Sequence, residues 1–183
     1  MEVNYFGTLN AAQPCLSKMR AKGKGLLIII GSIAGRVSIP MQSQYSASKY
    51  ALEAFTDAVR MEMKQYGVKA CIIEPGDTKT GFTAARETQK VSGGEGTDGN
   101  TGSGRNDAVY DSVLQKSVAK MAADEQNGRS PDSVAKVALA LAARKNPPAR
   151  VPVGLDYKAL MVLLRVMPDR GKEFILSKLY LPK

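Results

Sequence analysis

The chain contains, at residues 25–31, the sequence GLLIIIG. A short continuous apolar run of this kind, bounded by glycines, is typical of a strand buried on both faces of a parallel sheet. The preceding residues, from about Met1 to Met19, carry apolar side chains at helical spacing, and Gly23 to Gly25 end that segment. These features predict a helix followed directly by a buried strand.

Helical and extended patterns continue to alternate downstream. A loop with Gly35 and Pro40 leads into a second helix, and Ser130 is a strong N-cap candidate for a later one. Pro168 separates two amphipathic pieces in the tail. The sequence predicts helices over 43–66, 107–127 and 130–145 and in the tail at 157–181, and strands over 68–73 and 150–153. This order predicts the α/β class with a parallel sheet.

Length and composition place the chain among ordinary globular proteins. It has 183 residues, which predicts a single domain over 1–183, with 44% hydrophobic and 23% charged residues. The exception is a segment of about 89–107, which is rich in Gly, Ser, Thr and Asp and contains few apolar residues. Because such a segment buries little apolar surface, we expect a mobile loop there.

The charge balance is basic, with 26 Lys and Arg against 17 Asp and Glu and a formal net charge of +9. We interpret this mainly as a basic surface; attraction to an anionic ligand, a membrane surface or nucleic acid is the alternative. No zinc-finger spacing or aromatic-rich motif accompanies the basic residues, so we expect no nucleic-acid partner. No secretory signal or apolar stretch of about 18–20 residues is visible, which predicts a cytoplasmic protein.

The chain has no histidine, which excludes Ser-His-Asp and Cys-His triads and the usual catalytic zinc sites. Its two cysteines, Cys15 and Cys71, lie in apolar surroundings without CxxC spacing. They predict small buried side chains and no metal site. Acid–base chemistry must therefore come from Tyr, Lys, Asp, Glu or Cys.

The start of the second helix carries Tyr45 and Lys49, four residues apart and hence on one helix face. A tyrosine has an ordinary pKa of about 10, and a nearby ammonium lowers it by favouring the phenolate. An isolated YxxxK is common, and its ordinary interpretation is a core tyrosine and a solvated lysine. Ser32 follows the first strand, thirteen residues before Tyr45, and Asn4 lies on the first helix.

This arrangement resembles the short-chain dehydrogenase/reductase family. That family has a serine at the end of a strand, a Tyr-x-x-x-Lys motif thirteen residues later and an asparagine on the preceding helix. Downstream, Pro75-Gly76-Asp77-Thr78-Lys79-Thr80 is similar to the family's PG-x-[IV]-x-T segment, although Thr78 stands where Ile or Val is usual. The resemblance implies a partial Rossmann-type doubly wound parallel sheet, formed by the C-terminal strands and helices of the family's fold.

The resemblance also implies the chemistry, which is NAD- or NADP-dependent interconversion of a carbonyl and an alcohol. Tyr45 would be the general acid or base, and Lys49 would lower its pKa and bind the nicotinamide ribose. Ser32 would hold the substrate oxygen, and Asn4 would anchor a water that links Lys49 to solvent. The residues expected to line the cofactor are Tyr45, Lys49, Pro75, Gly76, Thr78 and Thr80. A homodimer or homotetramer is implied as well.

The family's Gly-rich cofactor turn between a first strand and helix is absent from this sequence. The opening helical pattern begins at residue 1 without a capping residue, and the strand at 25–31 lacks a predicted neighbour on one side. We therefore hypothesise that further sequence precedes Met1. The alternative to an enzyme is a non-catalytic remnant or assembly module that lacks the cofactor site.

Apolar residues in the loop after Ser32 and in the tail favour a hydrophobic alcohol or ketone as substrate. The tail is also compatible with a substrate lid or with peripheral contact to a membrane. Packing of the tail on the protein core is the interpretation that the sequence favours.

Overall fold

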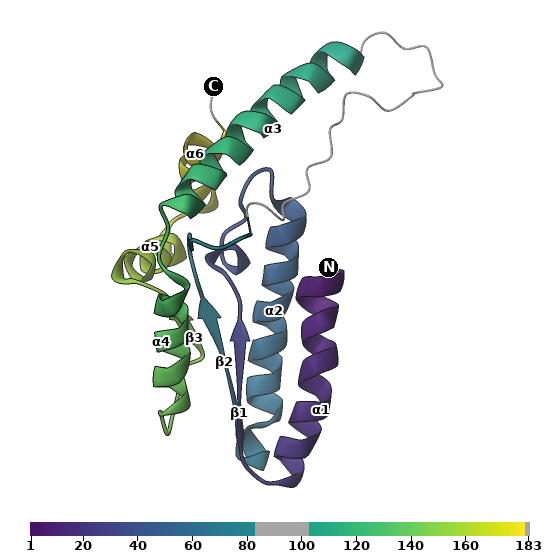
Figure 1. Cartoon of the computed structure of the whole chain (residues 1–183), viewed down its shortest axis with the longest axis vertical. Coiled ribbons are helices and arrows are strands. Elements are labelled where there is room, and N and C mark those ends of the chain that lie inside the picture. The colour runs from purple at the N-terminus through teal and green to yellow at the C-terminus, as the bar shows by residue number, and fades with distance from the viewer. Residues whose placement is uncertain (83–102, 182–183) are drawn as a thin grey trace.

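The computed structural model describes residues 1–82 and 103–181, and its centre is a small parallel sheet (Figure 1). The strands are β1 (Gly25–Ile30), β2 (Val68–Glu74) and β3 (Arg150–Pro152), in the order β1-β2-β3. Both strand pairings are parallel, with Gly25 beside Val68 and Ile73 beside Val151. Helices cover both faces of the sheet, which confirms the predicted α/β, doubly wound class (Figure 1).

The helices of the described residues alternate with the strands as predicted. They are α1 (Gly7–Ala21), α2 (Ser43–Glu62), α3 (Ser103–Gln126), α4 (Pro131–Ala142), α5 (Leu155–Val166) and α6 (Asp169–Tyr180). Three short turns complete the list: a π-helical turn at Glu2–Phe6 and 3₁₀ turns at Ile33–Gly35 and Lys64–Tyr66. The two amphipathic pieces predicted for the tail are α5 and α6, on either side of Pro168.

Alternation of side chains along the strands divides the core into two layers. One face of β1 and β2, including Ile29 and Ile72, packs against Leu52 and Phe55 of α2. Farther along the same face, α1 contributes apolar contacts as well. The opposite face, including Cys71, packs against α4. Since successive side chains of a strand point to opposite faces, a continuous apolar run supplies both layers at once.

Several element boundaries differ from the sequence prediction; α4, for example, ends at Ala142 rather than at about residue 145. The second helix ends as α-helix at Glu62, and a 3₁₀ turn continues to Gly67, whose φ of 68° is the left-handed conformation that glycine adopts readily. α3 begins at Ser103, so residues 103–107, which were predicted to belong to the loop, are helical. Extending an established helix adds a hydrogen bond for each residue fixed, which outweighs the polar composition of that turn. Residues 89–102 of the predicted loop lie outside the described residues.

Two burial predictions are wrong in part. Cys15 is exposed, because α1 packs only one of its faces on the sheet, whereas Cys71 is fully buried. β1 is mostly half-buried, and the side chain of Ile30 is 48% exposed. In the described part of the chain no strand pairs with the edge of β1 that faces away from β2. None of the described helices is both long and apolar enough to cross a membrane.

Candidate active site

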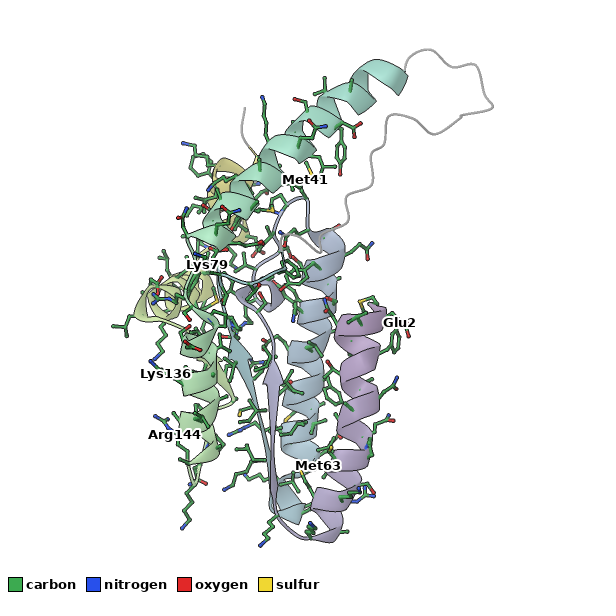
Figure 2. The ribbon with its side chains drawn as sticks, in the orientation of Figure 1. Glu2, Met41, Met63, Lys79, Lys136 and Arg144 are labelled. Atoms are coloured by element: carbon green, nitrogen blue, oxygen red, sulfur yellow. The ribbon has the colours of Figure 1, made fainter. Side chains whose placement is uncertain are left out.

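The predicted site residues, except Asn4, gather where the loops leave the carboxyl ends of β1 and β2. Figure 2 shows Met41 and Lys79, one from each loop, at this end of the sheet. Open α/β sheets bind ligands at the carboxyl ends of their strands, so the fold itself favours a site here.

Ser32 comes two residues after the end of β1 and is largely buried. Its hydroxyl donates to the carbonyl oxygen of Pro75 at 3.4 Å and accepts from the backbone N–H of Ala34 at 3.1 Å. The second contact caps the 3₁₀ turn at Ile33–Gly35. Ser32 is therefore fixed by both loops, and it is one of the residues that line the cavity between them.

Tyr45 lies in the first turn of α2, and that turn is anchored by two buried serines. The hydroxyl of Ser46 accepts from the N–H of Ile39 at 3.1 Å, which fixes the preceding loop to the helix. The hydroxyl of Ser48 donates to the carbonyl oxygen of Tyr45 at 2.7 Å. The ring of Tyr45 contacts that of Phe82, with 5.3 Å between the ring centroids.

Lys49 lies one helical turn after Tyr45, on the same side of α2. Its ammonium nitrogen is 5.6 Å from the centroid of the Tyr45 ring and donates to the carbonyl oxygen of Ile30 at 3.3 Å. Burial lowers the pKa of the Lys49 ammonium below its ordinary value. A cation at this distance favours the phenolate form of a tyrosine.

Asn4 lies apart from the cavity, in the π-helical turn that precedes α1. Its side-chain amide donates to the hydroxyl of Ser48 at 3.1 Å, and this hydroxyl in turn binds the carbonyl of Tyr45. The structure thus brings Asn4 to the first turn of α2. Its predicted role in a water relay to Lys49 stays a prediction.

The loop after β2 forms the opposite wall of the site. Pro75, Gly76, Thr78 and Thr80 all line the same cavity as Ser32, Tyr45 and Lys49. The hydroxyl of Thr78 donates to the carbonyl of Gly76 at 3.0 Å, which closes a tight turn. The hydroxyl of Thr80 accepts from the N–H of Phe82 at 3.2 Å.

The cavity has a volume of about 530 Å³, within the range of about 300–1,000 Å³ usual for small-molecule sites. Polar groups occupy the α2 side, and α4 forms an apolar part of the remaining wall, whereas α3 contributes Met121 together with the carboxylates of Asp124 and Glu125. The apolar lining includes Ile33, Ile39, Phe82, Met121, Val134 and Ala138. Such a cavity accepts an apolar molecule and presents its polar end to Tyr45 and Ser32.

A cluster of charged side chains, in which the two glutamates Glu53 and Glu74 are buried, joins α2 to the ends of the strands. Glu74, the last residue of β2, binds Arg36 at 3.3 Å. Glu53 binds Arg150 of β3 at 2.8 Å, and Arg150 also binds Asp57. Burial and the neighbouring Glu74 carboxylate raise the pKa of Glu53 to about 7, against the opposing effect of Arg150. Burial likewise raises the pKa of Glu74, against the opposing effect of Arg36.

Sequence reasoning did not identify Tyr157 or this charge cluster. Tyr157 begins the tail, 80 residues from the Asp77 that it contacts, and no motif links the two. The only signal for the cluster was a glutamate at the end of an apolar strand, since a charge at such a position requires a buried partner. Among the described residues, no group of three or more acidic or cysteine side chains is placed to hold a metal ion.

The described residues fit one end of a nicotinamide cofactor. A half-buried lysine that donates to the carbonyl oxygen of Ile30, a phenol and the loop at residues 75–80 face one cavity. Lys49, Tyr45 and the loop could therefore hold the nicotinamide and its ribose. The described part of the chain holds no glycine-rich turn between a strand and a helix that could hold the pyrophosphate.

Comparison with known proteins agrees with these motifs. The family model of the short chain dehydrogenases matches residues 1–91. A 3-ketodihydrosphingosine reductase from Bacteroides thetaiotaomicron is 33% identical over 98% of this chain and 63% of its own length. An uncharacterized oxidoreductase of Escherichia coli is 33% identical over 95% of this chain and 56% of its own length. The chain thus spans less than two thirds of these relatives.

Solved structures share the fold. A short chain dehydrogenase from Burkholderia cenocepacia, in complex with NADP, has a TM-score of 0.65 and 21% identity over the whole of this chain and 58% of its own length. One from Burkholderia phymatum, in complex with NAD, has a TM-score of 0.64 and 18% identity over 99% of this chain and 59% of its own length. Matching motifs, sequence relatives and fold lead to one assignment: the chain belongs to the short-chain dehydrogenase/reductase family.

Proposed function

We propose that this chain carries the catalytic part of an NAD(P)-dependent oxidoreductase, which interconverts a carbonyl and a primary or secondary alcohol. The observation that supports the proposal most is the convergence of Tyr45, Lys49 and Ser32 on one cavity with an apolar far wall. Elements far apart in the chain bring them there, and each is held by a specific hydrogen bond or ring contact.

Tyr45 is the proposed acid and base. In reduction its phenol gives a proton to the carbonyl oxygen, and in oxidation its phenolate takes the proton back. The Lys49 ammonium stabilises the phenolate. The hydroxyl of Ser32 turns its one proton from the carbonyl of Pro75 to the substrate oxygen as negative charge develops there. NADH or NADPH, when bound, supplies the hydride that reaches the carbonyl carbon.

The proposed substrate is a hydrophobic alcohol or ketone. The apolar side chains of α4, with Met121 of α3, would bury an alkyl chain, and each buried methylene contributes about 0.8 kcal/mol to binding. The Bacteroides relative is named for a 3-keto substrate, which fits the same chemistry. The predicted homodimer or homotetramer and the cytoplasmic location stay expectations from the sequence.

The test uses the purified chain and its Tyr45→Phe variant, which keeps the ring and lacks the hydroxyl. Calorimetric titration with NADH and NADPH measures cofactor binding, and turnover of a medium-chain ketone measures reduction. We expect saturable binding by both proteins and turnover by the parent only. Equal turnover by both would exclude Tyr45 as the acid. Absence of binding by a well-folded chain would show that this chain alone does not form the cofactor site, and would count against the proposal.

A further inference from the structure

The loop after β2 is held from outside the cavity by a residue of the tail. The hydroxyl of Tyr157, in the first turn of α5, accepts from the N–H of Asp77 at 2.9 Å and donates to the Asp77 carboxylate at 2.7 Å. Both contacts join residues 80 apart in sequence. Burial raises the pKa of Tyr157 above its ordinary value, and the Asp77 carboxylate adds to this, so the phenol keeps its proton.

The ring of Tyr157 lies directly against the backbone of Gly76. A β-carbon at position 76 would come within 2.0 Å of this ring, so any other residue would displace either the ring or the loop. The ring thus occupies the space on one side of the loop, while the cavity lies on the other. Glycine at this position is explained by the contact with Tyr157.

The link between α3 and α4 holds the same loop from a second direction. The N–H of Arg129 donates to the carbonyl of Asp77 at 3.0 Å, and the N–H of Lys79 donates to the carbonyl of Arg129 at 2.9 Å. These contacts form a parallel bridge between Thr78 and Arg129. The Arg129 guanidinium in turn binds Asp156, the neighbour of Tyr157, at 2.6 Å. Loop, link and α5 therefore form one hydrogen-bonded unit.

Displacement of the loop would also change the hydrogen bond that holds Ser32. Two residues before Asp77, the carbonyl of Pro75 accepts both from the hydroxyl of Ser32, at 3.4 Å, and from the N–H of Ile33, at 3.0 Å. We propose that Tyr157 is a positioning residue, which sets the loop of residues 75–80 at the distance that nicotinamide binding and Ser32 require. This proposal rests on the proposed function, because it assigns the loop to the cofactor.

The test compares Tyr157→Phe with a matched control, Tyr110→Phe. The first variant keeps the ring against Gly76 and loses both contacts with Asp77. The second makes the same change at a tyrosine of α3 that is 48% exposed. Amide hydrogen exchange measures how firmly the loop is held, and calorimetric titration measures the affinity for NADPH. We expect faster exchange at 76–79 with unchanged exchange at 68–73, and roughly tenfold weaker NADPH binding, because the Asp77 amide loses its partner.

Each outcome decides between the two proposals. Unchanged exchange at 76–79 in Tyr157→Phe would show that the contacts of Tyr157 with Asp77 do not hold the loop. Faster exchange with unchanged NADPH affinity would overturn the positioning role and leave the proposed function intact. Absence of NADPH binding by the folded parent chain would overturn the proposed function and the positioning role with it, while the exchange data would still test the contact. A similar loss in Tyr110→Phe would show that the effect is not specific to Tyr157.

Discussion

The buried charge cluster predicts an unusual dependence of stability on pH, which Glu53→Gln tests. Glu53 lies on α2, is 5% exposed and binds Arg150 of β3. Burial and the adjacent Glu74 carboxylate raise the pKa of Glu53 from 4.5 to about 7 in the folded protein. Glutamine has nearly the shape of a protonated glutamate, and its amide oxygen can still accept from Arg150.

The sign of the effect follows from proton binding. Between pH 4.5 and about 7 the folded protein retains a proton on Glu53 that the unfolded chain has lost. Stability from this residue is therefore fully present below pH 4.5 and is lost as the pH rises through about 7. At about 1.4 kcal/mol for each pKa unit, the full loss is of the order of 3 kcal/mol.

Urea unfolding of the parent chain and of Glu53→Gln at pH 5, 6, 7 and 8 measures the difference. We expect the parent to lose stability relative to the variant as the pH rises, by about 3 kcal/mol at most. Part of the slope is shared with Glu74, because the two carboxylates titrate as a pair. Glu62→Gln, an exposed change on the same helix, is the control and should follow the parent. If the unfolding free energies of the parent and of Glu53→Gln changed in parallel with pH, the reasoning would be refuted.

Three further substitutions, together with one exposed control, test the packing and helix capping that support the site. Leu52→Ala removes a side chain that is 1% exposed and should cost about 2–5 kcal/mol in urea unfolding, whereas Met61→Ala, at 72% exposed, should cost little. Gly31→Ala places a β-carbon 2.6 Å from the side chain of Ile72 and should lower the unfolding free energy by about 1–3 kcal/mol; an unchanged melting temperature would contradict this. Ser130→Ala removes the hydroxyl that accepts from Asp132 at 3.3 Å at the start of α4 and should cost about 1 kcal/mol, and equal unfolding midpoints would show that the cap contributes nothing.

The parallel sheet could be predicted because its strands are local and nearly all apolar. The run at residues 25–31 supplies both core layers, so its composition alone indicates a strand covered on two sides. The exposure of Ile30 agrees with the predicted lack of a neighbour on one side of this strand, because β1 lies at the edge of the described sheet. By contrast, the exposure of Cys15 depends on which face of α1 meets the sheet, and a helix with apolar residues on several faces leaves that open.

Most of the site could be predicted because its residues follow consecutive strands or share a helix turn. Tyr45 and Lys49 are neighbours by helix geometry alone, and Ser32 and the loop at residues 75–80 follow two strands that pair in register. Asn4 was identified by its motif, but its contact with Ser48 depends on how α1 packs on α2. The contact between Tyr157 and Asp77 required the whole path of the chain from β2 to α5.

The site and the charge cluster are mechanically connected, because they use neighbouring turns of the same elements. Glu53 lies one turn after Lys49 on α2, and Glu74 directly precedes Pro75, whose carbonyl binds Ser32. Arg36, which binds Glu74, follows the 3₁₀ turn that Ser32 caps. A change of charge at Glu53 therefore acts on the helix that carries Tyr45 and Lys49 and on both loops that face it. If the proposed function holds, Glu53→Gln should alter the pH profile of turnover as well as that of unfolding, although Glu53 does not line the cavity.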